Sequence, residues 1–247
     1  MLINTDGLVI MEQNIGENDR LITILTRDEG IIRAFVPGAK KLKNKNAVAT
    51  QLLSYSRLVL YKGRDKYIIN DAEAEEIFFS LRFAVEKLSL AQYFCELTLA
   101  FAPEQAEAGD FLRLLLNALY FLANDKMAPS LIKPIVEMRM LAMAGYMPDL
   151  IGCKKCGQYE AHEMFFLPYQ GLLYCKDCCP TYEAKKILLD LGAVTALRHT
   201  IYAEFSKIFS FTLSEVARAK LSEATEQYVV ARAEKRFKTL EFYHQIC

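Results

Sequence analysis

The sequence predicts an α+β fold, in which a five-stranded barrel precedes a helical domain with an inserted four-cysteine zinc module. Apolar runs separated by turn residues occupy roughly the first seventy positions. Beyond them, apolar residues recur at steps of three and four, which indicates helices. Two Cys-x-x-Cys pairs then interrupt the helical part. We therefore predict domains at residues 1–75 and 76–247, with the metal module at about 150–180.

The N-terminal part contains five short runs rich in β-branched and apolar residues, each followed by a turn signal. The polar, lysine-rich stretch between the third and fourth runs predicts one long loop. Five strands with one long loop fit a small closed barrel such as the OB-fold, although an SH3-like barrel would give a similar pattern. The expected strands are 7–10, 20–26, 31–36, 52–61 and 66–69.

The rest of the chain has helical periodicity in several stretches bounded by capping residues, Gly or Pro. Asp110 and Ser130 are candidate N-caps, Gly145 follows the end of one stretch, and Thr181 opens another. The expected helical stretches are 73–101, 111–124, 131–144, 181–199 and 213–235.

Charge is unevenly distributed along a chain whose formal net charge is zero. Residues 33–66 contain nine basic residues and one acidic residue, a net charge of +8, so the other 213 residues sum to −8. Such a cluster attracts phosphate groups whatever the total charge. The alternative is a solvated loop whose lysines only keep the chain soluble, and composition alone does not separate the two.

The cysteine spacing is that of a four-thiolate zinc site. Cys153 and Cys156 form one Cys-x-x-Cys pair, and Cys175 and Cys178 form a second after eighteen intervening residues. Four thiolates leave no open coordination position, so the predicted site holds one structural Zn²⁺. Cys179 is an alternative to Cys178, and disulfides or a redox pair are the competing interpretations of the motif.

No catalytic motif for nucleotide binding, nucleophilic attack or metal-dependent hydrolysis is present, so we expect a protein that is not an enzyme. No apolar run is long enough for a membrane span, and Met1–Asp6 does not look like a signal peptide. We expect a cytoplasmic protein.

Several further motifs are spread in order along nearly the whole chain. They are Gly16–Thr26 with Asp28–Gly30, Val36–Lys41, Gly63–Asp65, Glu137–Leu141, Gly145–Leu150 before Cys153, Gly171–Cys175 and Lys238–Phe242. In this order and spacing they resemble the RecO family of bacterial DNA repair proteins, although Thr239 stands where that family has Ser.

The resemblance implies an OB-fold, a helical domain with a zinc module, and a recombination mediator of the RecF pathway. Such proteins bind single- and double-stranded DNA, anneal complementary strands and help load RecA on DNA coated with single-strand-binding protein. The implied partners are DNA, RecR and the C-terminal tail of single-strand-binding protein, at the bacterial nucleoid and away from membranes.

We assign the basic segment to DNA phosphates. Arg20, from the matched motif, is a further candidate, and its alternative role is to pair with Asp19 or Glu17. Lys133 and Arg139, on a Met-rich helix, are candidates for the acidic tail of single-strand-binding protein. The alternative function is a zinc-ribbon protein–protein adaptor without direct DNA binding. The candidate DNA-binding residues are Arg20, Arg33, Lys40, Lys41, Lys43, Lys45, Arg57, Lys62, Arg64 and Lys66.

Overall fold

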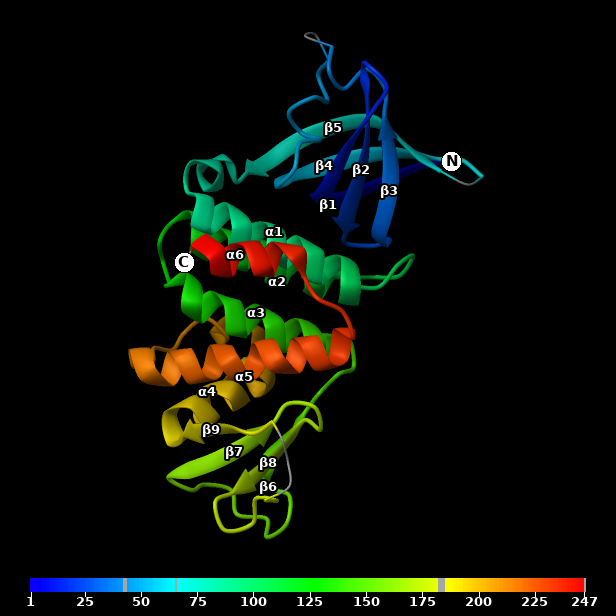
Figure 1. Ribbon diagram of the computed structural model, residues 1–247. Coiled ribbons are helices and arrows are strands. Elements are labelled where there is room, and N and C mark those ends of the chain that lie inside the picture. The colour runs from blue at the N-terminus through cyan, green and yellow to red at the C-terminus, as the bar shows by residue number, and fades with distance from the viewer. Residues whose placement is uncertain (42–43, 65, 182–184, 247) are drawn as a thin grey trace. The chain divides into compact units, whose positions relative to one another are not determined.

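The chain folds into two compact units in the computed structural model (Figure 1). Unit 1 comprises Met1–Asn124 and Phe237–Cys247, and unit 2 comprises Asp125–Arg236. The predicted division at residue 75 follows the change from strands to helices, whereas the units follow packing. In unit 1, two helices contact the barrel strands, and a third helix packs against one of these two. The structure describes residues 1–41, 44–64, 66–181 and 185–246.

Unit 1 begins with a closed five-stranded barrel of order β1-β2-β3-β5-β4, which confirms the predicted OB-fold barrel. β1 is long enough to pair with both β2 and β4, and the parallel pairing of β3 with β5 completes the ring. Alternate side chains of β4 point into the apolar core, as expected for a strand with one buried face. The strands are β1 (Leu2–Ile15), β2 (Asp19–Thr26), β3 (Gly30–Val36), β4 (Ser54–Lys62) and β5 (Tyr67–Ile77).

β5 corrects one expectation, because residues 73–77 belong to this strand and not to a helix. Ala72 and Ala74 pair with Leu58 and Ser56 of β4, so the barrel supplies backbone partners that a helix would otherwise provide. Residues 73–76 are all exposed, so no buried apolar residue marks a period of two in this part of the sequence.

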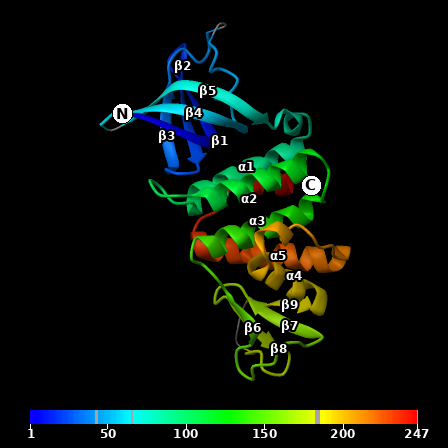
Figure 2. The same cartoon turned by 180° about the vertical axis from the view of Figure 1, so that it is seen from behind.

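Three α-helices and a short 3₁₀ turn make up the rest of the described part of unit 1. The helix α6, which the sequence patterns did not predict, lies beside α1 in both views (Figures 1 and 2). Thr239 fixes this packing, because its backbone N–H and its hydroxyl both donate to the Glu96 carboxylate. The elements are η1 (Phe79–Phe83), α1 (Val85–Phe101), α2 (Gly109–Ala123) and α6 (Lys238–Ile246).

The described residues of unit 2 form three α-helices, a short 3₁₀ turn and a four-stranded sheet of order β6-β8-β7-β9. The helix expected from Thr181 begins only at Leu191, after strand β9, and the Asp190 side chain caps it by accepting from the Ala193 N–H at 2.7 Å. No helix among the described residues is long and apolar enough to cross a membrane. The elements are α3 (Pro129–Met143), β6 (Asp149–Cys153), β7 (Glu163–Leu167), β8 (Leu172–Cys175), β9 (Ile187–Asp190), α4 (Leu191–Tyr202), η2 (Phe205–Lys207) and α5 (Glu215–Ala233).

Candidate metal site and nucleic-acid interface

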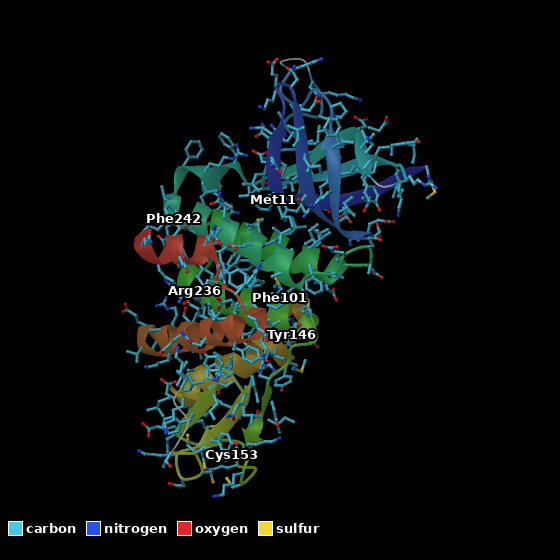
Figure 3. The ribbon with its side chains drawn as sticks, turned by 45° about the vertical axis from the view of Figure 1, so that its right-hand side comes forward. Met11, Phe101, Tyr146, Cys153, Arg236 and Phe242 are labelled. Carbon is cyan, nitrogen blue, oxygen red and sulfur yellow. The ribbon has the colours of Figure 1, made fainter. Side chains whose placement is uncertain are left out.

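Four cysteine sulfurs gather at one end of the unit 2 sheet, where Figure 3 labels Cys153. Cys153 ends β6 and Cys175 ends β8, while Cys156 and Cys178 lie in the turns that follow these strands. The four Sγ atoms all lie within 4.8 Å of one another, and the Cys156 and Cys175 sulfurs are 3.8 Å apart. The fold thus brings the predicted ligand set together.

Cys178, and not its neighbour Cys179, belongs to this four-sulfur group. Both backbone N–H groups donate to the Cys175 carbonyl, which forms the tight turn that follows β8. The Cys179 sulfur instead contacts the Pro180 carbonyl oxygen at 3.8 Å. The structure therefore places the Cys178 sulfur, which the two-residue spacing favours, in the group and leaves the Cys179 sulfur outside it.

Glycine permits the close approach of backbone segments around the first cysteine pair. A Cβ atom on Gly152 would lie 2.9 Å from the carbonyl oxygens of Gly157 and Gln158, and Gly157 itself has a φ of +76°. The Gly157 N–H donates to the Cys153 carbonyl, which closes the turn. This geometry aims two sulfurs at one point.

The donor set fits a tetrahedral thiolate-bound metal. Four sulfurs at about 2.3 Å from a tetrahedral Zn²⁺ would lie about 3.8 Å from one another. The Cys156–Cys175 separation equals this value. Four such ligands close the coordination sphere, so the arrangement can stabilise a fold but offers no position for a substrate.

Six of the described candidate DNA-binding cations of the barrel lie in two separate places. Lys40, Lys41 and Lys45 belong to the long loop after β3, which we call the loop patch. Arg64 and Lys66 lie at the β4–β5 turn. Arg33 lies near this turn, because its neighbour Ala34 pairs with Tyr67 where the parallel strands β3 and β5 meet. We call these three residues the turn patch. The loop and the turn are at different ends of the barrel (Figures 1 and 2). Lys43 lies outside the described residues.

Four of the candidate cations lie close to carboxylates within the barrel, and one of them, Arg20, is described below. Lys45 contacts Asp71 at 2.8 Å, Lys62 contacts Glu29 at 2.9 Å, and Arg57 pairs with Glu75. Five others have no acidic partner among the residues that the structure describes. These five are Arg33, Lys40, Lys41, Arg64 and Lys66.

The pair formed by Lys62 and Glu29 is strengthened by Tyr67. The Tyr67 hydroxyl and the Glu29 carboxylate raise the pKa of Lys62 to about 12. Conversely, the hydrogen bond from Lys62 and, as the next largest cause, the hydrogen bond from Tyr67 lower the pKa of the Glu29 carboxyl group. The pair remains ionised near neutral pH, so Lys62 is partly neutralised before any ligand arrives.

Arg20 has an internal role in the structure. Its side chain is only 12 % exposed, donates to the Thr50 carbonyl at 3.0 Å and lies 3.6 Å from the Glu12 carboxylate. A second hydrogen bond reaches the Ala47 carbonyl. Arg20 thereby anchors the end of the loop that carries the loop patch, which sequence order could not reveal.

A groove of about 650 Å³ on the barrel is predominantly acidic and lies apart from the unpaired cations. Its acidic residues come from β1, from β5 and from the turn between β2 and β3, and Arg27 and Arg57 are its only basic residues within the described part of the chain. Such a surface repels phosphate, so it restricts where a nucleic acid can approach. The acidic residues are Asp6, Asp28, Asp71, Glu73 and Glu75.

Lys133 and Arg139, the residues predicted to bind a partner's acidic tail, both make internal contacts on α3. Lys133 is 1 % exposed and contacts Glu137 and Glu226, each at 2.9 Å. Arg139 donates to the carbonyls of Ile201 and Ala203. Burial within unit 2 is the physical reason to assign Lys133 a structural role instead of the expected one.

Together these features define a two-part protein, an OB-fold joined to a helical region that carries a four-cysteine module. Family models described as "Recombination protein O N terminal" and "Recombination protein O C terminal" match residues 1–78 and 82–241. The chain therefore belongs to the RecO family of DNA repair and recombination proteins.

Relatives named "DNA repair protein RecO" align with most or all of the chain. The one from Acetivibrio thermocellus is 33 % identical over 240 residues, covering 97 % of this chain and 95 % of the relative. The one from Symbiobacterium thermophilum is 31 % identical over 244 residues, covering 98 % and 96 %. A relative from Desulforudis audaxviator is 37 % identical over 175 residues, covering 70 % and 69 %.

Proposed function

We propose that the chain is a non-enzymatic recombination mediator that binds single- and double-stranded DNA through the loop patch and the turn patch. The observation that carries this proposal is the set of five exposed barrel cations without acidic partners among the described residues. Membership of a DNA repair family supports the choice of DNA as the ligand.

The proposed function requires phosphate binding. This needs positively charged side chains that are long enough to contact the DNA backbone, but it needs no recognition of the bases. Long Lys and Arg side chains contact phosphates and release counterions, and this gives affinity without sequence preference. Two patches at different ends of the barrel suit the annealing of complementary strands, since two segments of backbone can be held while their repulsion is reduced.

The proposal extends to the RecF pathway, in which the mediator acts with RecR and helps RecA replace single-strand-binding protein in the bacterial cytoplasm. Family membership supports this extension. The tail of single-strand-binding protein would require an exposed cation next to an apolar groove, and buried Lys133 does not provide one.

Three double variants that each remove two positive charges test the assignment. K40A/K41A removes unpaired cations from the loop patch and R64A/K66A removes them from the turn patch. R57A/K62A is the matched control, because those cations are already paired with Glu75 and Glu29. Each variant removes the same charge, so the long-range attraction between protein and DNA weakens equally in all three. Differences in DNA binding among the variants therefore report the loss of direct phosphate contacts.

The measurement is the slope of log affinity against log salt concentration for a single-stranded oligonucleotide. Loss of two phosphate contacts should make the slope less negative by about 1.4. We expect this change in K40A/K41A and in R64A/K66A, and little change in R57A/K62A. Unchanged binding and slope in both patch variants would favour the adaptor function instead.

We further propose that Cys153, Cys156, Cys175 and Cys178 hold one structural Zn²⁺. The support is the four-sulfur geometry and the purely thiolate character of the group, because thiolates favour zinc over hard cations. When bound, the metal would supply a cross-link between the turns that follow β6 and β8. The residues themselves contribute closed coordination and no catalytic position.

A further inference from the structure

Arg198, on α4, reaches across unit 2 to the segment that carries the first cysteine pair. Its Nε donates to the Leu150 carbonyl at 2.8 Å. One terminal nitrogen donates to the Ile151 carbonyl at 3.3 Å and to the Tyr159 carbonyl at 2.7 Å. These carbonyls precede Cys153 and follow Cys156, so one guanidinium spans both sides of the turn.

The backbone hydrogen bonding between β6 and β8 is interrupted where Arg198 binds. β6 pairs with β8 at Asp149 and at Cys153, but the register shifts between them, and Leu150 and Ile151 lie in that interruption. A buried carbonyl without a donor is costly, and Arg198 supplies donors there. The side chain of Arg198 thus completes the hydrogen bonding of an irregular strand.

Arg198 is itself an unusual buried charge, with 7 % of the residue exposed. Within the part of the chain that the structure describes, no carboxylate pairs with it. The carbonyl dipoles and the face of the Tyr159 ring, whose centroid lies 4.1 Å from the guanidinium carbon, stabilise it instead.

We propose that Arg198 is a positioning residue for the metal site, which fixes the segment around Cys153 and Cys156 in its ligating geometry. The inference rests on the proposed metal site. The hydrogen bonds of Arg198 go to backbone carbonyls of residues 150–159, so it acts on the cysteines through the backbone. Metal retention should therefore depend on its forked geometry, not only on its charge.

The variants R198K and R198A separate geometry from charge. Lysine keeps the positive charge but cannot present donors in a planar fork to three carbonyls. Arg139 gives a matched control, because it also donates to two backbone carbonyls of unit 2 and lies over a ring, that of Phe205. Its carbonyl partners, Ile201 and Ala203, belong to no cysteine turn, so R139K should disturb packing without disturbing the metal.

The experiment measures zinc content, the rate of zinc transfer to a chelator, and the absorption bands of the Co²⁺-substituted full-length chain. Loss of supporting contacts around metal ligands typically weakens binding 10- to 100-fold. We expect R198K and R198A to release zinc at least about tenfold faster than wild type, with altered Co²⁺–thiolate bands. R139K should match wild type in both measurements, and its thermal unfolding reports any general loss of stability. If R198A does not fold, R198K alone is compared with wild type and with R139K.

The experiment distinguishes a failure of the proposed metal site from a failure of the proposed role of Arg198. A wild-type chain that binds neither Zn²⁺ nor Co²⁺ overturns the metal site and, with it, the role of Arg198 toward that site. A wild type that holds one zinc, with equal release rates and equal Co²⁺ spectra in wild type and R198K, overturns the inference about Arg198 alone. Zinc release from R139K that is as fast as release from R198K would also contradict it.

Discussion

At the scale of single residues, the buried charges of α3 and α5 show how burial changes what a side chain does. Lys133 contacts two glutamates, and the Thr225 hydroxyl donates to the Glu137 carboxylate at 2.6 Å. Burial raises the pKa of the Glu137 carboxyl group, although Lys133 and Thr225 both act in the opposite direction. The network holds α3 against α5 and requires all of its members, since an unpaired buried charge is expensive.

Replacing Lys133 with Met tests this network. Met has a similar length and no charge, so the change leaves Glu137 buried without its cation. We expect the free energy of unfolding to fall by about 3 kcal/mol. Urea unfolding followed by circular dichroism measures the change.

The control for Lys133→Met is Lys220→Met on α5. Lys220 pairs with Glu223 at 3.3 Å, and both side chains are about half exposed. An exposed pair contributes at most about 1 kcal/mol, so this variant should unfold at nearly the wild-type urea concentration. Equal losses in the two variants would contradict the structural role of Lys133.

At the scale of elements, the turn between β2 and β3 is fitted closely against the segment that joins α1 to α2. Gly30 has a φ of +63°, and a Cβ atom there would collide with the Pro103 carbonyl oxygen and lie 2.7 Å from that of Ala106. The neighbouring Ile31 N–H donates to the Pro103 carbonyl at 2.9 Å. Barrel and helices of unit 1 therefore meet at a position that only glycine can fill.

The turn of β1 into β2 offers a comparison for Gly30→Ala. Gly16 has a φ of +58°, but nothing lies within 4 Å of the place that a Cβ atom would occupy, so Gly16→Ala adds backbone strain alone. That strain costs about 1–2 kcal/mol. Gly30→Ala adds a collision with backbone and should cost about 1–3 kcal/mol more. Thermal or urea unfolding of both variants gives the difference, and equal stabilities would show that the contact with Pro103 relaxes freely.

At the scale of the whole molecule, the proposed DNA contacts and the proposed metal site belong to different units. All described cations of the two patches lie in unit 1, whereas the four cysteines lie in unit 2. Electrostatic affinity for DNA depends on the number of phosphate contacts, and thiolate coordination contributes none. The two properties should therefore be separable.

Metal removal tests this separation. Cys178→Ser should lose zinc, and a loss of about 3 kcal/mol would lower the unfolding temperature by roughly 6–12 °C for a chain of this size. The slope of DNA affinity against salt should stay at its wild-type value. Cys179→Ser is the control, because Cys179 lies outside the four-sulfur group and its loss should leave one zinc per chain. Elemental analysis, calorimetry and salt titration provide the measurements; zinc retained in the Cys178 variant would contradict the ligand assignment.

The sequence alone determined the features that depend on local spacing. Alternating apolar residues and turn signals predicted the five strands of the barrel, and the spacing of the Cys-x-x-Cys pairs predicted which sulfurs gather. Each of these patterns is set by a few consecutive residues, because backbone geometry fixes which side chains share a face or a turn.

Only the tertiary structure decided which charges are available and which are buried. Arg57 and Lys62 find acidic partners on other strands or turns, while Lys40 and Lys41 find none among the described residues. Arg198 reaches the cysteine turn from 39 to 48 residues away in sequence. The reason is physical: the free energy of a charge depends on its neighbours in space and on its burial, and chain order specifies neither before the elements pack.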